Sequence, residues 1–511
     1  MSCDIIKLEN VSYSYFRSAE KALDEVNLSV PEGVFLAVMG ENGSGKTTLC
    51  KLLNGIIPHH CEGNLSGLVT IDGIYTKDSS VPQLALKTGM VLDDPDAQLF
   101  TSTVRREAAF GPENILLPPE EIEERVEFAL NSVGLADLKN RRPSTLSGGE
   151  KQRLVIAAAL AMKAKILVLD EPLCRLDPNG AADVMAVLKD IQCKNRITVI
   201  MATHDSAKAA EFADMVCVLK NGKIAAYDTA KKIFSNSALL KENGIQPMEE
   251  NVRGKTRIFT ESVEYSISSS ASFCVNQEVN LRTLCSVEVP RTIICEISNL
   301  SFSYPGGAGI QNINLSVAEN EFLAITGDNG CGKTTLLKSI TGLLRPAGGD
   351  IYIRGKNIKK LKIYEISKDA GFVMQNPDTQ LFTSSVYKEV SFALKKMKLS
   401  GTEIKQRVQN ALETAGLQDT DAFPHALNRA DRTKVLIACI LAMGCKIIIL
   451  DEVDVGNDYN GSLKIMNLLR DLHSKGFTII FVTHNMSLVS EYAHRVINMD
   501  RNGIRNDWRL E

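Results

Sequence analysis

The 511-residue chain lacks a strong net charge, a long apolar run and any Cys-x-x-C pair. Its formal net charge of −3 gives the whole chain no electrostatic attraction for nucleic acid, so we expect no nucleic-acid partner. The apolar stretch at Leu154–Met162 ends at Lys163. A membrane-spanning helix needs about 20 apolar residues, so we expect no span. The N-terminus, MSCDIIKLEN, has no charged start followed by an apolar core, and we predict no signal peptide.

The twelve cysteines are isolated from one another, and several lie in apolar segments, such as Cys217 and Cys439. This distribution favours buried, reduced thiols over disulfides or a zinc site. The one candidate metal cluster is His59-His60-Cys61 with Glu62. No second pair of ligands accompanies it, so a polar loop is the favoured interpretation.

A long internal repeat organises the chain. Three landmarks recur at a nearly constant offset: Lys46 and Lys333, Asp170 and Asp451, and His204 and His484. At roughly 150 residues per domain the length would allow three or four units, but two large units fit as well. We predict a first domain at residues 1–235, a linker with a SISSSAS tract at residues 236–290, and a second domain at residues 291–511.

Both copies predict an α/β fold. Short apolar strands at 34–39 and 322–326 lead into glycine loops, and amphipathic helices are expected at 118–135 and 401–417. Further apolar strands follow in each copy. Strands that alternate with helices imply a largely parallel sheet covered by helices.

Each copy carries a glycine loop between a strand and a helix. The loops read GENGSGKT from Gly40 and GDNGCGKT from Gly327. In such a loop the backbone N–H groups and the helix N-terminus surround a phosphate. Lys46 and Lys333 are predicted to reach the β- and γ-phosphates. Thr47 and Thr334 are predicted to bind Mg²⁺.

Acidic pairs end one buried strand of each copy, and a Thr-His pair ends another. At this distance from a glycine loop, the aspartate suits Mg²⁺ and the glutamate suits activation of the attacking water. The histidine suits a polar contact to the γ-phosphate. The residues concerned are Asp170, Glu171 and His204 in the first copy and Asp451, Glu452 and His484 in the second.

The phrase LSGGEKQR occurs intact only in the first copy, at Leu146–Arg153. Ser147 offers a hydroxyl, and Gly148 and Gly149 permit close backbone approach at a helix start. The first copy already has a glycine loop for its own phosphate, so the expected partner is the nucleotide of the other copy. The second copy reads LNRADRTK at Leu427–Lys434.

Together these motifs resemble the ATP-binding cassette (ABC) ATPases over nearly the whole chain outside the linker. The resemblance implies tandem P-loop NTPase cassettes, each with a mainly parallel sheet core, an antiparallel β subdomain and a helical subdomain. It also implies that Tyr15 and Tyr304 stack on adenine; the alternative is a core or edge-strand tyrosine. The predicted ATP-binding residues are Tyr15, Gly40, Glu41, Asn42, Gly43, Ser44, Gly45, Lys46, Thr47, Thr48, Ser147, Gly148, Gly149, Tyr304, Gly327, Asp328, Asn329, Gly330, Cys331, Gly332, Lys333, Thr334 and Thr335.

A finer resemblance lies in DDPDAQLF at Asp93–Phe100 and QNPDTQLF at Gln375–Phe382. These segments, with FGPEN at Phe110–Asn114, are similar to the Q-loop region of energy-coupling factor ATPases, which energise importers of vitamins, cobalt or nickel. The resemblance implies a peripheral ATPase on the cytoplasmic face of the membrane, docked to integral membrane subunits through its Q-loops. A separate membrane subunit would bind the small-molecule cargo. As bare chemistry, the Leu-Phe pair of each segment would equally fit a core.

In that family two cassettes enclose two ATP molecules head to tail. The length of the linker permits a fused chain to pair its own cassettes, and pairing with a second copy is the alternative. Site one would combine the first glycine loop with the altered 427–434 segment. It has Asp93 at the position where site two has Gln375. Gln375 is a predicted catalytic and Mg²⁺-binding residue. Site two would use Ser147 and the two glycines after it. The second D-loop, at 455–458, is also unusual, whereas 174–177 keeps a Leu-Asp ending. We therefore expect site two to carry turnover and site one to hydrolyse ATP slowly.

Two other functional classes fit the motifs less well. A soluble tandem ABC switch on the ribosome would favour a long charged helical linker, and an ABC protein of DNA repair would need zinc cysteines or a long coiled coil. The sequence shows none of these features. Cys331, inside the second glycine loop, is either a thiol-sensitive position or simply a small residue that the loop tolerates.

Overall fold

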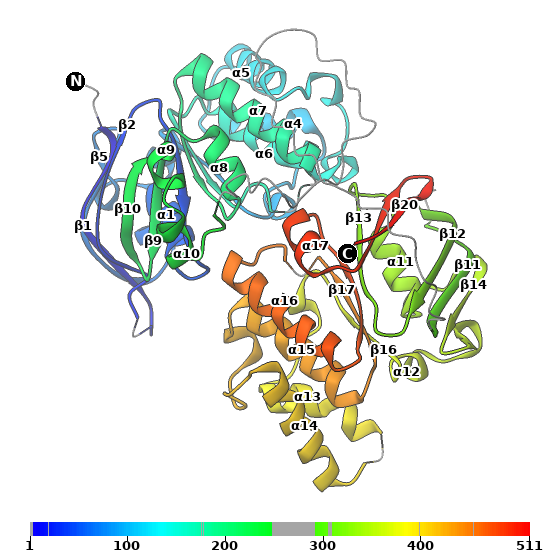
Figure 1. Cartoon of the computed structure of the whole chain (residues 1–511). Helices are drawn as coiled ribbons and strands as arrows, with labels where there is room; N and C mark the ends of the chain where they lie inside the picture. The colour runs from blue at the N-terminus through cyan, green and yellow to red at the C-terminus, as the bar shows by residue number, and fades with distance from the viewer. Residues whose placement is uncertain are drawn as a thin grey trace. The chain divides into compact units, whose positions relative to one another are not determined.

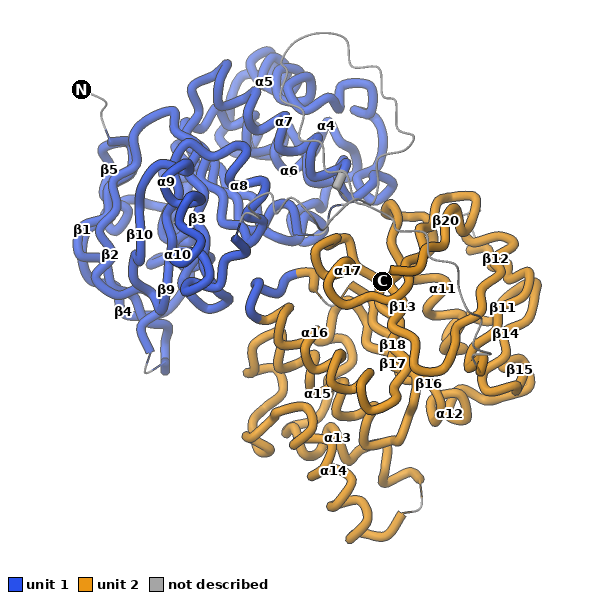
Figure 2. Tube along the Cα trace, in the orientation of Figure 1, with its two compact units in different colours: residues 1–248, 456–460 blue, residues 249–455, 461–511 orange. Residues whose placement is uncertain are grey.

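The structure is a computed structural model that describes residues 4–18, 20–174, 176, 178–247, 292–304, 309–397, 399–452 and 454–510. The chain divides into two compact units (Figure 2). Unit 1 contains residues 1–248 and 456–460, and unit 2 contains the remainder. Most of the predicted linker, together with the SISSSAS tract, lies outside the described residues.

The elements of unit 1 are labelled in Figure 1. In chain order they are β1 (Asp4–Tyr15), β2 (Leu23–Pro31), β3 (Phe35–Met39), α1 (Lys46–Leu53), α2 (Ile56–His59), β4 (Gly63–Ile71), β5 (Ile74–Tyr75), α3 (Val81–Ala85), β6 (Thr88–Val91), α4 (Val104–Asn114), α5 (Pro119–Ser132), α6 (Gly148–Ala161), β7 (Ile166–Asp170), α7 (Pro178–Asn195), β8 (Thr198–Ala202), α8 (Ser206–Phe212), β9 (Met215–Lys220), β10 (Lys223–Thr229), α9 (Ala230–Phe234) and α10 (Ser237–Glu242).

The main sheet of unit 1 has the order β10-β9-β3-β8-β7-β6. Strands β9, β3, β8, β7 and β6 are parallel, and β10 pairs antiparallel with β9 at the edge. Every residue of β3, β7 and β8 is buried, as expected for a parallel sheet covered on both faces. Because these strands run in one direction, the segments that follow β3, β7 and β8 all emerge at the same edge of the sheet.

A second sheet of unit 1, with the order β2-β1-β4-β5, is antiparallel. Its inner face, α1 and one face of the main sheet share a single hydrophobic cluster, which includes Ile6, Leu49 and Val168. A second cluster joins α4, α5, α6 and α7 to the other face of the main sheet through Phe35 and Leu154. In Figure 1 these four helices gather at one end of the unit, away from β1, β2 and β5.

Unit 2 repeats this architecture. Its elements are β11 (Ile293–Ser303), β12 (Gly309–Ala318), β13 (Phe322–Gly327), α11 (Lys333–Ile340), β14 (Gly348–Ile353), β15 (Lys356–Asn357), α12 (Ile363–Ile366), β16 (Ala370–Val373), α13 (Val386–Lys396), α14 (Gly401–Ala415), α15 (Arg429–Met443), β17 (Ile447–Asp451), α16 (Tyr459–Ser474), β18 (Thr478–Val482), α17 (Met486–Tyr492), β19 (Arg495–Asp500) and β20 (Gly503–Arg509).

The sheets of unit 2 have the orders β16-β17-β18-β13-β19-β20 and β12-β11-β14-β15. The first is parallel except for its β19–β20 edge, and the second is antiparallel. The predicted fold class, a tandem α/β arrangement with parallel cores, antiparallel sheets and helical layers, is confirmed.

The units differ after their edge hairpins. Unit 1 continues into α9 and α10, and Leu240 of α10 and Ile245 just after it are buried in a cluster with Val216. Residues 236–247, which were predicted to belong to the linker, therefore pack on unit 1. Among the helices that the structure describes, none combines the length and the apolar composition needed to cross a bilayer.

Candidate nucleotide-binding sites

The two glycine loops have nearly the same backbone. Gly40 follows β3 with a φ of 144°, and Gly327 ends β13 with a φ of 139°. A Cβ atom at either position would lie 2.1 Å from a backbone oxygen, that of Leu219 or of Met499. Only glycine fits such a close approach. The loops then lead into α1 and α11, whose N-termini face the loop interior and are suited to an anion.

The lysine of each loop folds back into the loop. Lys46 Nζ donates to the carbonyls of Gly40 at 2.9 Å and Glu41 at 3.1 Å. Lys333 Nζ donates to the equivalent carbonyls at 2.7 and 3.0 Å. Burial lowers the pKa of Lys46. Each ammonium group thus lies inside its own glycine loop, and its contact with the β- and γ-phosphates stays a prediction.

Asp170 and Asp451 end β7 and β17, and each is almost fully buried. Burial raises the pKa of Asp170, and it raises that of Asp451 to about 6. A hydrogen bond from the threonine of the neighbouring glycine loop, Thr47 or Thr334, opposes the shift. The Oδ1 atom of each aspartate has no hydrogen-bond partner among the described residues. A buried carboxylate oxygen without a donor, beside a hydroxyl group, fits the hard oxygen ligands that Mg²⁺ prefers.

The glutamates that follow, Glu171 and Glu452, have positive φ angles of 49° and 46°. Such a conformation is strained for a residue other than glycine, and strain of this kind gathers at functional sites. Each glutamate meets the predicted histidine, because His204 Nε2 lies 3.2 Å from Glu171 Oε1 and His484 Nε2 lies 3.3 Å from Glu452 Oε1. The structure thus brings the predicted acid and histidine of each copy together.

The Q-loop residues distinguish the two glutamates. Gln375 Nε2 donates to Glu452 Oε2 at 2.8 Å. Asp93 stands at the corresponding position in unit 1, and its side chain has no N–H group like that of Gln375. Burial raises the pKa of Glu171 to about 8, and the negative charges of Asp170 and Asp93 add to that rise.

Tyr15 and Tyr304 lie beside the glycine loops. The hydroxyl of Tyr15 is 3.0 Å from Thr48 Oγ1, and that of Tyr304 is 3.4 Å from Thr335 Oγ1. Each ring also packs edge-to-face on the aromatic ring two residues earlier in the chain. Neither tyrosine is fully buried, so each ring retains a surface on which adenine could stack. Adenine stacking stays a prediction.

The intact LSGG segment forms an exposed helix start. Ser147 caps α6, and its Oγ accepts from Glu150 N at 3.3 Å while Glu150 Oε2 accepts from Ser147 N at 2.7 Å. Gly148 and Gly149 have no positive φ. A Cβ atom at these positions would lie 3.7 and 3.6 Å from its nearest described neighbours, which is ordinary contact. The described part of unit 1 therefore gives no steric reason for glycine here, and a close-lying ligand would supply one.

The altered segment of unit 2 keeps the cap but redirects the next side chain. Asn428 Oδ1 accepts from Asp431 N at 2.9 Å, so α15 still has an N-cap. Arg429 Nη2 donates to the Gln375 carbonyl at 2.9 Å, within the same unit. Ala430 is buried. The place of the Ser-Gly-Gly sequence is thus filled by side chains engaged inside unit 2.

Residues 456–460, the end of the second D-loop and the start of α16, belong to unit 1 (Figure 2). Within that unit, Asn42 N donates to Asp458 Oδ2 at 2.6 Å, and Asn42 Nδ2 donates to Gly456 O at 3.2 Å. Asn460 Nδ2 donates to Glu41 Oε1 at 2.7 Å. The pentapeptide therefore contacts the first glycine loop. In the first D-loop, residues 175 and 177 lie outside the described part.

An exposed aromatic pair stands beside each Q-loop. Phe100 and Phe110 are 66% and 43% exposed, with ring centroids 4.7 Å apart at 88°. Phe382 and Phe392 are 64% and 46% exposed, with centroids 4.8 Å apart at 88°. The preceding leucine in each copy packs into the helical core instead. The Leu-Phe pairs thus divide between core and surface.

Sequence reasoning missed the residues that hold these Q-loops in shape. Buried Glu107 accepts from Phe100 N and Thr101 N, and Glu389 accepts from the equivalent two amides in unit 2. An ion pair joins each Q-loop to α6 or α15. Lys151 of α6 pairs with Asp96 at 2.7 Å, and Arg432 of α15 pairs with Asp378 at 2.7 Å. An alignment of the two copies at their fixed offset would have revealed the buried glutamates and the ion-paired residues, because both features recur in the second copy.

The remaining candidate residues, Cys331 and His59, are buried in the fold or contact its backbone. Cys331 is buried, and burial raises the pKa of its thiol. His59 Nε2 lies 2.9 Å from the Thr76 carbonyl. Among the residues that the structure describes, no group of three His, Cys, Asp or Glu side chains is arranged to hold a metal ion.

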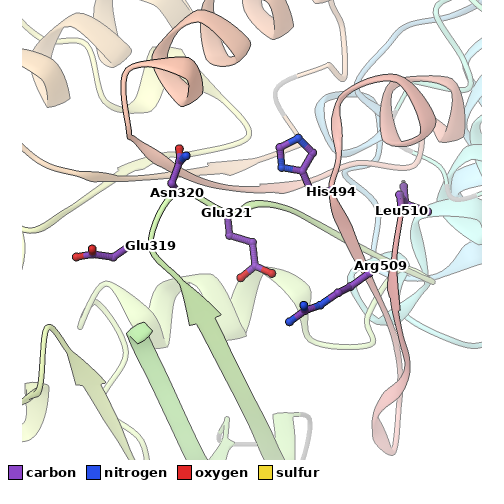
Figure 3. Close-up of a pocket in the computed structure, with 6 residues that line it drawn as sticks. All are labelled: Glu319, Asn320, Glu321, His494, Arg509 and Leu510. Carbon is purple, nitrogen blue, oxygen red and sulfur yellow. The ribbon is translucent and has the colours of Figure 1, made fainter. Parts of the chain in front are cut away.

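A cavity of about 390 Å³ in unit 2 lies away from the glycine loop (Figure 3). It is lined by Glu319, Asn320, Glu321, His494, Arg509 and Leu510, around the start of β13 and of β19. The buried Glu321 carboxylate already pairs with Arg495 at 3.2 Å. The parallel strands begin at this edge and end at the opposite one, so the cavity is separate from the nucleotide site.

Comparison with known proteins gives a family match for both copies. The family model described as ABC transporter matches residues 23–174 and 310–454. A protein of Caldanaerobacter subterraneus subsp. tengcongensis, named as an ABC transporter ATP-binding protein, is 35% identical over 97% of this chain and 89% of its own length. A similarly named protein of Methanosarcina mazei is 36% identical over 98% of this chain and 88% of its own.

Solved structures match single cassettes. CbiO1 of Clostridium perfringens, described as part of the ABC transporter complex cbiONQ, is 35% identical, with a TM-score of 0.41. The match covers 43% of this chain and 89% of that one. The cassette MJ0796, in its ADP- and phosphate-bound dimer, is 29% identical, with a TM-score of 0.39 over 44% of this chain and 98% of that one.

Proposed function

This chain belongs to the ABC transporter family and is an ATPase with two ATP-binding cassettes, and we propose that it is the energising subunit of an importer of the energy-coupling factor type. Binding of ATP would close the paired cassettes, and hydrolysis would reopen them. The motion would pass through the Q-loops to integral membrane subunits. The ATPase would sit peripherally at the cytoplasmic face of the membrane, and a separate membrane subunit would bind the small-molecule cargo.

The observation that carries this proposal is the aromatic pair beside each Q-loop. Two large rings that stay exposed at the same place in both units, with the same edge-to-face geometry, are a surface kept for a partner. Aromatic side chains are enriched in the centres of protein interfaces. The buried glutamates Glu107 and Glu389 hold the backbone beneath these rings, so each surface is formed before any partner binds.

Mg²⁺ is the proposed metal of both sites. Thr47 with Asp170, and Thr334 with Asp451, would hold it, and the Oδ1 atoms that lack a donor support this assignment. The side-chain oxygen of Gln375 would be a further ligand at site two. The ion would neutralise charge on the β- and γ-phosphates.

The two ATP sites are proposed to be composite and unequal. Site two would join the second glycine loop, Gln375, Glu452 and His484 to the exposed Ser147 tip of the first cassette. The absence of a steric need for glycine at 148 and 149 supports a ligand there. Site one would join the first glycine loop to the altered segment of the second cassette.

Site one is proposed to bind ATP and to hydrolyse it slowly. Asp93 cannot donate to Glu171 as Gln375 donates to Glu452, and Arg429 is engaged with its own Q-loop. The loss of one preorganised donor to a developing charge costs about 2.7–4 kcal/mol, or roughly 100- to 1,000-fold in rate. The transporter names of the relatives do not support the alternative of a ribosomal switch.

Purification of the chain from detergent-solubilised native membranes tests the transport proposal. We expect integral membrane proteins to co-purify with the wild-type chain and to be lost from F100A/F110A/F382A/F392A. A matched control is L68A/Y75A, which removes two exposed apolar side chains from the antiparallel sheet of unit 1. Thermal unfolding checks that both variants are folded. Co-sedimentation with ribosomes, without any membrane protein, would refute the proposal.

A further inference from the structure

One surface segment of unit 2 is strongly basic. The segment runs from Lys356 to Lys368, through β15 and α12, and contains a single acidic residue, Glu365. Its five lysines, all exposed, are Lys356, Lys359, Lys360, Lys362 and Lys368. Lys359 lies 3.2 Å from Asp350, whereas among the described residues no ion pair involves Lys360 or Lys362. Most of this positive charge is therefore directed to solvent.

Exposed apolar side chains lie among these lysines. Ile363 and Tyr364, the first residues of α12, are 50% and 58% exposed, and Leu343 is also exposed. Two contacts bring the chain around Leu343 against this segment. Arg345 donates to the carbonyls of Ile358 and Leu361, each at 2.8 Å, and a Cβ atom at Gly342 would lie 2.5 Å from the Ile366 side chain. Apolar and basic groups thus form one surface, which we name the α12 patch.

The α12 patch has no counterpart in unit 1, although the backbone does. Residues 73–88 follow the same course as residues 355–370, with a 3₁₀ turn at 76–78 matching that at 358–360 and α3 matching α12. At the positions of Lys360, Lys362 and Lys368, unit 1 has Asp78, Ser80 and Leu86. The fold therefore does not need the lysines, since the same turn and helix form without them.

We propose that the α12 patch binds the phosphate groups of anionic lipids at a membrane surface, with Ile363 and Tyr364 entering the interface. Each lysine of a cluster near an anionic bilayer is attracted to the negative surface potential of the bilayer. Apolar side chains between the lysines supply the second attraction that stable interfacial binding requires. Tyrosine suits this position because its ring is amphipathic.

This inference goes beyond the proposed function, because it needs no membrane protein subunit. An ATPase bound only through its Q-loops requires that subunit. An ATPase with the α12 patch would also bind protein-free vesicles. The lipid-binding proposal and the proposed function can therefore be refuted independently. A failure to bind vesicles would leave the co-purification result unchanged, and a failure of membrane proteins to co-purify would leave vesicle binding unchanged.

Co-sedimentation of the purified full chain with lipid vesicles tests the proposal. The probes are vesicles of phosphatidylcholine alone and of phosphatidylcholine mixed with phosphatidylglycerol. We expect binding only to the anionic vesicles, and weaker binding as salt rises. The variant K360D/K362S/K368L, which copies unit 1, should bind at least tenfold more weakly, and I363S/Y364S should also bind more weakly while keeping its salt dependence.

The matched control is K388Q/K395Q/K396Q, which removes three exposed lysines from α13 of the same unit. It should bind as the wild type does. Equal loss in this control, or no loss in K360D/K362S/K368L, would overturn the proposal. So would binding to a DNA duplex through the same lysines without binding to anionic vesicles. The reciprocal variant D78K/S80K in unit 1 should strengthen vesicle binding, and its failure to do so would count against the proposal.

Discussion

The two cassettes share one fold. They differ in a few side chains around the glutamate that follows the aspartate at the end of β7 or β17. In unit 2, Gln375 donates a hydrogen bond to Glu452. In unit 1, Asp93 occupies that position, and the pKa of Glu171 rises to about 8 through burial, with Asp170 and Asp93 adding to it. The backbone, the positive φ and the histidine contact are the same in both. A duplicated fold thus keeps its geometry while one copy changes its chemistry.

The segments that begin α6 and α15 differ in the opposite sense, because here unit 1 has the intact sequence and unit 2 has the altered one. Unit 1 keeps an exposed serine that caps α6 and two glycines for which the described part of the unit gives no steric reason. Unit 2 keeps the cap through Asn428 but turns Arg429 inward to Gln375. In the proposed composite arrangement, each cassette would therefore contribute one intact half of site two. This complementarity gives physical content to the proposal that the intact halves work together.

The comparison is tested most severely by removing each glutamate in turn. Glu452→Gln should abolish steady-state ATPase activity, whereas Glu171→Gln should leave most of it, because site two is proposed to carry turnover. The measurement is phosphate release at saturating ATP. Both variants should still bind a fluorescent ATP analogue, which separates hydrolysis from binding. Equal losses of activity in the two variants would refute the unequal assignment.

The helix caps give the next largest effect. Ser147→Ala should lower the turnover number by about 100- to 1,000-fold, because it removes one preorganised donor from site two. Asn428→Ala removes the equivalent cap of α15 and should cost about 1 kcal/mol of stability, with little change in turnover. Steady-state ATPase and chemical unfolding measure the two quantities. A similar loss of turnover in both variants would show that capping alone matters.

A swap of the Q-loop residues sharpens the comparison further. Gln375→Asp should lower ATPase activity roughly tenfold or more, because a hydrogen bond to a charged group contributes about 1.5–3 kcal/mol. Asp93→Gln should raise the slow activity of site one by a similar factor. That gain is measured in the Glu452→Gln background, where site two is silent. No gain there would mean that the altered signature segment alone limits site one.

Much of the fold followed from the sequence because its signals are local. The apolar strands around the glycine loops and before the Asp-Glu pairs have buried positions throughout, and their short length and flanking turns leave little choice of structure. The landmarks at fixed offset then predicted two similar units. The assignment of residues 236–247 to a linker missed the packing of Leu240 and Ile245, which depends on a tertiary cluster with β9.

The candidate sites were predictable where a motif fixes both residue type and spacing. The lysines, aspartates, glutamates and histidines of each copy do meet in the structure. The contacts between distant segments were not predictable, because no local pattern encodes them. Examples are the inward turn of Arg429 to Gln375 and the division of each Leu-Phe pair between core and surface.

The smallest expected difference between the cassettes lies in their glycine loops, where unit 1 has Ser44 and unit 2 has Cys331. Cys331 is 4% exposed, and burial raises the pKa of its thiol, so little reactive thiolate is present at neutral pH. Cys331→Ser, which copies unit 1, should therefore change ATPase activity by less than about twofold. Iodoacetamide should label the exposed Cys193 before Cys331, as read by peptide mass spectrometry. Rapid inactivation of the wild type, with Cys331→Ser protected, would instead make this thiol an accessible part of site two.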